Sequence, residues 1–91
     1  WTARSLRGSR QRTALRGDGA TIADRVELSV ANLGAEPREV WLEEPLRPAR
    51  RRDVVHARSA RPAVEGDAAR LKLVVEPGTT ERVSFTIRYA F

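Results

Sequence analysis

The single histidine is the first residue to consider for chemistry in this chain of 91 residues. A metal site there would need carboxylate ligands, and those nearest in the sequence are Asp53, Glu65 and Asp67. On a strand, Asp53 and His56 would point to opposite faces of the sheet, which disfavours a shared ion. The absence of cysteine also excludes zinc-thiolate sites and a cysteine nucleophile. We therefore expect a structural histidine, with no metal and no cofactor.

Carboxylates and hydroxyls are also poorly arranged for catalysis. Glu43 and Glu44 are adjacent, so they would lie on opposite faces of a strand, as exposed charges rather than as an acid–base pair. The serines lack the turn that presents a nucleophile. Residues 17–19 with Asp24 lack the carboxylate density of a calcium loop, and an ordinary turn is expected there. We expect no enzymatic activity.

Arginine is the residue type that could carry a binding function. Lys and Arg number 17 against 12 Asp and Glu, and residues 47–61 carry six arginines and one aspartate. These guanidinium groups could bind the anionic groups of a nucleic acid or of an acidic polysaccharide. Alternatively, they pair with Glu39, Glu43 and Glu44 or with a neighbouring subunit, or they reflect a GC-rich genome. The candidates are Arg47, Arg50, Arg51, Arg52, Arg58 and Arg61.

The two signs of charge are also separated along the chain. Residues 1–23 carry five arginines and one aspartate, whereas residues 24–46 carry two arginines and six acids. The acidic segment therefore lies between two basic ones. It could pair with them across a sheet, or it could form a polar surface that orients a partner.

Trp41 is a second candidate for binding, because alternation places it on the polar face of its strand. An outward tryptophan can anchor an interface, unless the N-terminal residues fold back over it. Phe85, Tyr89 and Phe91 fall instead on the expected core face. They therefore leave no platform on which nucleic-acid bases could stack.

Alternating apolar residues predict the strands that must position these side chains. Residues 76–79, with Pro77 before Gly78, are typical of a type II turn. Residues 32–37 supply another turn, in which Gly34 is free to adopt a positive φ. The alternation runs through residues 24–30, 38–44, 69–75 and 83–91.

Two segments are less regular. Residues 53–60 could form a strand or a short helix between Pro48 and Pro62, and the paired valines favour the strand. Residues 1–18 contain few apolar positions and are expected to form an edge strand or a loosely held arm. A chain that begins with tryptophan is expected to be a fragment of a longer protein.

The fold class follows from the strands and their spacing. Five to seven short strands without an amphipathic helix predict an all-β fold, an immunoglobulin-like antiparallel β-sandwich, although a small barrel would give a similar pattern. The length allows a single domain over residues 1–91. No apolar run is long enough to span a membrane.

Two stretches carry a resemblance to a known family. Val-Glu-Leu-Ser-Val-Ala-Asn-Leu-Gly-Ala-Glu-Pro-Arg-Glu-Val at residues 26–40 and Pro-Gly-Thr-Thr-Glu-Arg-Val-Ser-Phe-Thr-Ile-Arg-Tyr at residues 77–89 are similar to the C-terminal β-sandwich of mucoidy-inhibitor-like proteins. That family has no established function, and the similarity covers residues 24–91. It implies an accessory domain without catalytic residues, and it favours a place in the cell envelope or outside the cytoplasm.

The leading hypothesis is a non-catalytic module for structure, assembly or protein–protein interaction in a larger bacterial protein. It would bind a protein partner or a second copy of itself through its strand edges and Trp41. The alternative is polyanion binding through the arginines of residues 47–61. The two differ in whether those arginines form one exposed stripe or are paired with acids.

Overall fold

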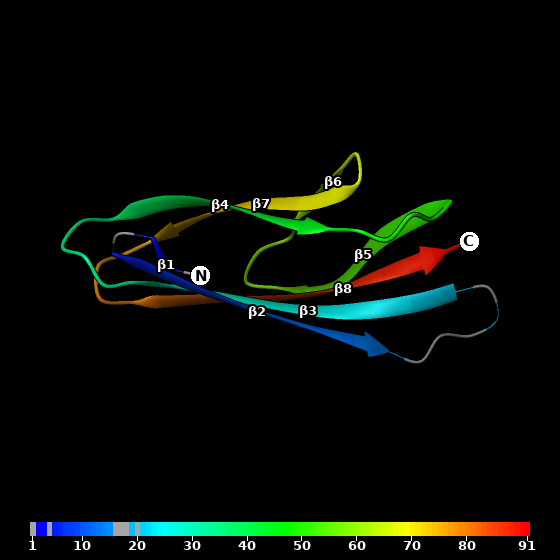
Figure 1. The fold of residues 1–91 in the computed structure, drawn as a ribbon, viewed down its shortest axis with the longest axis horizontal. Helices are drawn as coiled ribbons and strands as arrows, with labels where there is room; N and C mark the ends of the chain where they lie inside the picture. The colour runs from blue at the N-terminus through cyan, green and yellow to red at the C-terminus, as the bar shows by residue number, and fades with distance from the viewer. Residues whose placement is uncertain (1, 4, 16–18, 20) are drawn as a thin grey trace.

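The computed structural model describes residues 2–3, 5–15, 19 and 21–91. Within these residues the chain forms strands and no helix, and the strands make two antiparallel sheets that pack face to face (Figure 1). The predicted all-β antiparallel sandwich is confirmed. The strands are β1 (Thr2–Ala3), β2 (Leu6–Leu15), β3 (Thr21–Asn32), β4 (Arg38–Pro45), β5 (Arg51–Arg58), β6 (Ala63–Glu65), β7 (Ala68–Val75) and β8 (Thr80–Ala90).

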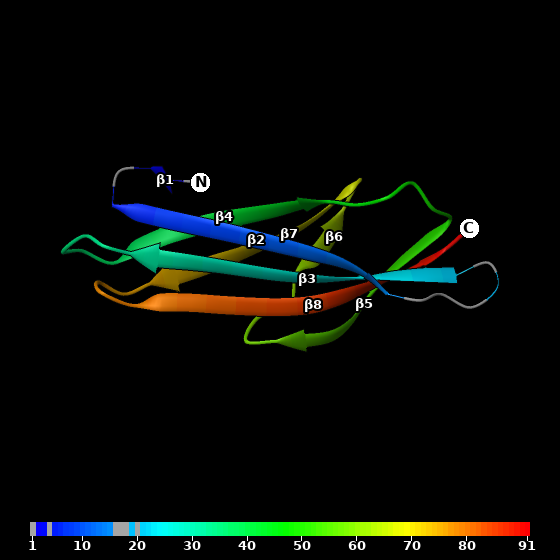
Figure 2. The ribbon, with the colours of Figure 1, turned by 60° about the horizontal axis from the view of Figure 1, so that its bottom comes forward.

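The larger sheet has the order β1-β2-β3-β8-β5, and the smaller sheet has the order β4-β7-β6 (Figure 2). The β3–β4 loop and the β7–β8 turn both cross between the sheets at one end of the sandwich. In the constant-type immunoglobulin order the last strand lies at the edge of the smaller sheet, whereas β8 lies inside the larger one. Strands β3 and β8 therefore have a neighbour on each side.

The N-terminal segment takes part in the larger sheet. β2 pairs with β3 along its whole length, from Leu6 opposite Asn32 to Leu15 opposite Ala23. β1 pairs with β2 and forms the edge of the sheet. Residues 6–15 are thus held by a complete ladder of backbone hydrogen bonds, and residues 53–60, where a strand or a helix was possible, contribute to β5.

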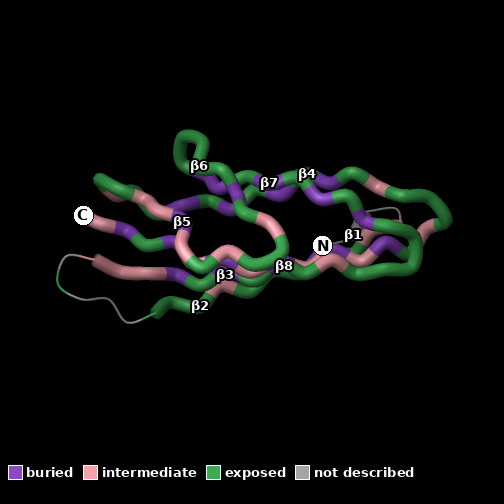
Figure 3. The backbone as a smooth tube through the Cα atoms, turned by 180° about the vertical axis from the view of Figure 1, so that it is seen from behind, coloured by how far each residue is buried: buried purple, intermediate pink, exposed green. Residues whose placement is uncertain are grey.

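The core lies between the sheets and is formed by the alternate residues that face inward (Figure 3). Phe85, Ile87 and Tyr89 of β8 have no exposed surface. The expectation that Phe91 belongs to the core was wrong, because its side chain is 54% exposed. β8 ends at Ala90, and the Phe91 ring just beyond it stacks on Tyr89, with 6.4 Å between the ring centroids.

The turns explain two of the predicted loop positions. Gly78 has a φ of 71°, and Thr79 N donates to the carbonyl oxygen of Glu76 at 3.2 Å, as the type II turn requires. Gly34 has no positive φ, so that part of the prediction was wrong. Gly34 is needed for space, because a Cβ there would lie 2.8 Å from the Ser5 Oγ.

The molecule is elongated, with extents of 49 × 23 × 20 Å. No helix of the described residues is long and apolar enough to span a membrane. The predicted turn at residues 17–19 lies largely outside the described residues, since of these only Gly19 is described.

Candidate binding surfaces

The six candidate arginines do not form one exposed stripe. Arg47 Nε donates to the Asp24 Oδ2 at 2.8 Å, and Arg61 Nη2 donates to the carbonyl oxygen of Val54 at 2.7 Å. Arg52 lies opposite the buried Tyr89 and is half-buried. At least two guanidinium groups of residues 47–61, those of Arg47 and Arg61, therefore make hydrogen bonds that stabilise the fold.

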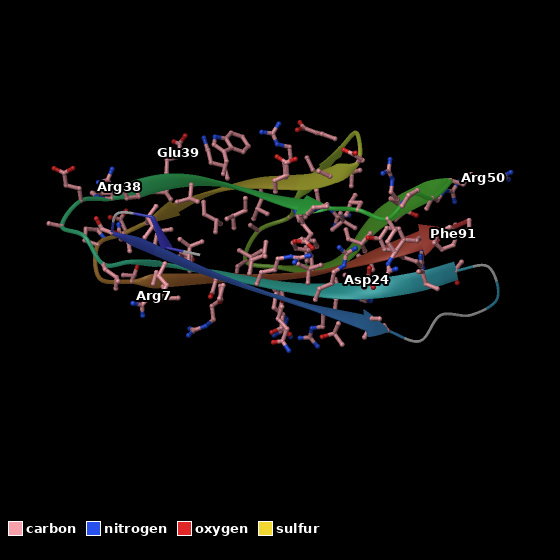
Figure 4. The ribbon with its side chains drawn as sticks, viewed as in Figure 1. Arg7, Asp24, Arg38, Glu39, Arg50 and Phe91 are labelled. Atoms are coloured by element: carbon pink, nitrogen blue, oxygen red, sulfur yellow. The ribbon has the colours of Figure 1, made fainter. Side chains whose placement is uncertain are left out.

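The other three candidates are exposed but separated. Arg50 lies at the end of the sandwich, where its backbone N donates to the carbonyl oxygen of Ala90 at 2.9 Å (Figure 4). Arg51 pairs with Ala90 near the start of β5, and Arg58 pairs with Ser84 at the other end of that strand. Arg58 is thus set apart from the run at residues 50–52.

The glutamates do pair with basic residues, but not with the predicted ones. Glu39 Oε2 lies 3.9 Å from the Lys72 Nζ, and Glu43 Oε2 lies 3.7 Å from the Arg70 Nε. These pairs join β4 to β7 on the outer face of the smaller sheet and are exposed. Exposed pairs of this kind contribute at most about 1 kcal/mol.

Two acids, Asp24 and Glu44, are buried, with side chains 1% and 0% exposed. The prediction that Glu44 is an exposed charge was wrong. Both side chains lie between the sheets, where Figure 4 shows Asp24. Alternation does place residues 24 and 44 on the inner faces of their strands, which was the signal that pointed to burial.

The buried acids are bound by arginines from β2 and from the β4–β5 connection. Arg10 donates to both oxygens of Glu44 at 2.6 Å, and Arg12 joins the two acids, at 2.8 Å from the Asp24 Oδ2 and 3.2 Å from the Glu44 Oε1. We call Arg10, Arg12, Asp24, Glu44 and Arg47 the inter-sheet ion cluster. Because every carboxylate oxygen accepts from a guanidinium group, the cluster holds the sheets together and has no free base for catalysis.

The arginines also determine the ionisation of the cluster. Burial of Asp24 opposes its ionisation, but hydrogen bonds from Arg47 and Arg12 outweigh this effect, and the pKa of Asp24 is lowered. Hydrogen bonding and charge attraction to Glu44 raise the pKa of Arg10. Among the described side chains no buried nitrogen or oxygen atom lacks a hydrogen-bond partner.

Trp41 lies on the outer face of the smaller sheet, and its side chain is 60% exposed. The guanidinium carbon of Arg70 lies 5.6 Å from the ring centroid, and the Lys72 Nζ lies 5.9 Å from it. The described N-terminal residues belong to the other sheet and leave the ring uncovered. Val74, 54% exposed, extends the apolar surface on the same face.

Beside Trp41 lies a shallow depression between β4 and β2. Its volume is about 220 Å³, and it is lined by Trp41, Leu42, Glu43 and Arg10 among others. β4 is an edge strand, so one side of its backbone is unpaired in the described part of the sheet. We call the Trp41 ring, the β4 edge and this depression the β4 surface.

His56 is exposed and has a φ of 52°. The described residues contain no group of three or more His, Cys, Asp or Glu side chains placed to hold a metal ion.

Comparison of the chain with family models, curated proteins and solved structures gave no match. The resemblance to mucoidy-inhibitor-like proteins therefore stays an expectation from the sequence.

Proposed function

We propose that this domain is a non-catalytic accessory module of a larger bacterial protein, and that it binds another protein through the β4 surface. The observation that carries the proposal is an edge strand with a largely exposed tryptophan at its centre. Unpaired backbone groups can accept a partner strand by β-addition, and a tryptophan beside them can supply an anchor.

The Trp41 ring is held in place by two neighbouring cations. Arg70 and Lys72 of the neighbouring strand both lie within 6 Å of its ring centroid, a distance at which cations and aromatic rings attract each other. A ring that is already ordered loses little conformational entropy on binding. The depression beside it offers room for an apolar side chain of the partner.

Charge indicates the chemistry of the partner strand. Glu39 and Glu43 flank Trp41 on the outer face of β4, and their side chains are 58% and 62% exposed, so their oxygens are accessible to a partner. A strand that alternates basic and apolar residues would offer cations to Glu39 and Glu43 and apolar side chains to the β4 surface. The proposed partner is therefore a protein with an extended basic–apolar segment.

A second copy of this chain fits the β4 surface less well. If two β4 strands paired antiparallel about Trp41, Glu39 of each copy would lie opposite Glu43 of the other. Like charges directly opposite each other destabilise a strand pair. We therefore expect the domain to be a monomer in solution.

A nuclear magnetic resonance titration tests this proposal with a synthetic peptide of alternating lysine and valine. We expect backbone amide shifts at Glu39, Trp41 and Glu43, and Trp41→Ala should weaken binding about tenfold or more. A version of the peptide with N-methyl groups on alternate amides should not bind, because it cannot donate to β4.

Leu33→Ala is the matched control, since Leu33 is 62% exposed but lies in the β3–β4 loop. Binding that survives Trp41→Ala or N-methylation would contradict the proposal. Sedimentation that shows a dimer dependent on Trp41 would assign the β4 surface to self-association instead.

A further inference from the structure

A groove lies on the outer face of the larger sheet and adjoins the depression of the β4 surface at Ser9, Arg10, Leu28 and Ser29, which line both. It has a volume of about 650 Å³ and is lined by residues of β2, β3, β8 and β5. The strand register places its side chains in rows: Ser9, Ser29 and Arg82 form one row, and Gln11, Glu27, Ser84 and Arg58 form the next.

Arg58 reaches this groove because of a β-bulge in β5. Val55 pairs with Thr86 and Arg58 pairs with Ser84, so three steps along β5 match two along β8. Without the extra residue, alternation would turn Arg58 toward the inside. Two residues around the bulge, His56 and Ser59, have positive φ values of 52° and 71°, which non-glycine residues rarely adopt.

The bulge is itself supported by an arginine. Arg61 Nη2 donates to the carbonyl oxygen of Val54, just before the bulge. Strained backbone of this kind persists only where the surrounding structure holds it, and it gathers at binding sites. The bulge, with its positive φ values, thus places the Arg58 side chain on the face of the sheet that carries the groove.

Two cations of the groove have no acidic partner. Arg25 Nε lies 3.2 Å from the Glu27 Oε1, whereas the side chains of Arg58 and Arg82 make no ion pair with any described residue. Arg82 is two residues from Ser84, the pairing partner of Arg58, so the two cations are diagonal neighbours on one face. Their repulsion would be relieved by a bound anion.

Besides Arg10 and the Arg25–Glu27 pair, the other polar groups of the groove are hydroxyls and an amide. Serines at positions 9, 29, 59 and 84 and Gln11 line it, and no aromatic side chain of the described residues does. Single-stranded nucleic acid is bound largely by stacking on aromatic rings, which this groove does not offer. Hydroxyl and amide groups beside two arginines instead suit a chain of sugars that carries anionic groups.

We propose that this groove binds an acidic polysaccharide, with Arg58 and Arg82 contacting its carboxylate or sulfate groups and the serines and Gln11 contacting its hydroxyls. Arg58 and Arg82 line the groove but not the β4 surface, so variants at these two positions test this proposal separately from the proposed function. The site also differs from the arginine run at residues 50–52, which lies outside the groove.

Fluorescence polarisation with three labelled probes tests the proposal: an oligogalacturonate for carboxylates, a heparin oligosaccharide for sulfates, and an oligothymidylate. We expect at least one acidic sugar to bind more tightly than the oligothymidylate. Its affinity should fall about tenfold between about 50 mM and about 200 mM salt, as expected for two neutralised charges. The better of the two sugars identifies the anionic group.

Arg58→Gln and Arg82→Gln should each weaken binding about fivefold and lower the salt slope by about one. Arg50→Gln is the matched control, an exposed arginine outside the groove, and should have no effect. The proposal is overturned if neither sugar binds at low salt, if the oligothymidylate binds more tightly, or if Arg50→Gln weakens binding as much as the groove variants do. Unchanged thermal unfolding of the variants shows that they fold.

Discussion

Arg12 is the side chain on which the buried charges depend most. It donates to Asp24, Glu44, the Tyr89 hydroxyl and the carbonyl oxygen of Pro45, at distances between 2.8 and 3.2 Å. Two carboxylates buried near each other repel unless a cation lies between them. The inter-sheet ion cluster is therefore stable as a complete set, and removal of its central member leaves uncompensated charge.

Arg12→Met should lower the free energy of unfolding by about 3 kcal/mol, because breaking a buried ion pair costs far more than breaking an exposed one. Urea unfolding measures this change. Arg25→Met is the control: its pair with Glu27 has side chains 56% and 51% exposed, and its loss should cost less than about 1 kcal/mol. Equal effects of the two substitutions would show that the buried cluster contributes no more than a surface pair.

Asp24 should make the stability depend on pH on the acid side. Its pKa is lowered in the folded protein, so the unfolded chain, with an Asp pKa of about 3.9, binds the proton more readily. The stability that Asp24 contributes is present above about pH 5 and is lost as the pH falls below 4, through the lower folded-state pKa.

Urea unfolding of the native chain and of Asp24→Asn from pH 7 to acid measures this contribution. We expect Asp24→Asn to be less stable by about 2 kcal/mol at neutral pH, with the difference shrinking in acid. A difference that stays constant over the whole range would mean that the charge of Asp24 has no part in the effect.

Sequence could place these acids but not their environment. Alternation puts residues 24 and 44 on inner faces, yet an isolated carboxylate is costly to bury, so exposure was the physical expectation for Glu44. The compensating arginines come from β2 and from residue 47, which are distant in the sequence. The one sequence signal for this pairing was the charge by segment, which is basic in residues 1–23 and acidic in residues 24–46.

At the scale of elements, hydrogen bonds from Asn32 and Leu33 close the end of the sandwich where the β3–β4 loop and the β7–β8 turn cross between the sheets. Asn32 Nδ2 donates to the carbonyl oxygens of Glu36 and Val75 at 2.7 and 2.9 Å. Leu33 N donates to the carbonyl oxygen of Ser5 at 2.7 Å, which brings the start of β2 against the β3–β4 loop. This close approach is why a glycine occupies position 34.

Gly34→Ala should destabilise the fold by about 2 kcal/mol, because its Cβ would lie 2.9 Å from the Ser5 Cβ, and neither backbone can move freely. Thermal unfolding checks this effect. Ser5→Gly in the same chain removes both clashing atoms and should restore most of the stability. If Ser5→Gly has no such effect, the clash is not the cause.

The strands that could be predicted are those with an apolar inner face. β3, β4, β7 and β8 alternate between apolar and polar residues and were located within a few residues. β2 was not defined, because its inner positions include Gly8, Arg10 and Arg12 rather than apolar residues. The bulge of β5 was also hidden, since the positive φ values fall on His56 and Ser59 and not on glycines.

For the whole molecule, the two outer faces differ in charge. Among the described residues, the smaller sheet carries Trp41 with acids and bases in nearly equal number, whereas the larger sheet presents six arginines against Glu27 and Asp53. Sequence could give the net charge of +5 but not this division, because it depends on strand order. The outward arginines of the larger sheet are Arg7, Arg25, Arg51, Arg58, Arg82 and Arg88.

The position of β8 has a consequence for how the chain is made. β8 is the last of the described strands and lies between β3 and β5, so each of these lacks one neighbour until β8 pairs with it. A nascent chain on the ribosome can form the β2–β3 hairpin and the smaller sheet, but it exposes two unpaired edges and half of a core until residue 90 emerges. Folding of the domain is therefore expected to be completed only after β8 has been synthesised. The incomplete nascent chain, with its unpaired strand edges, is the form most prone to aggregate and to bind chaperones.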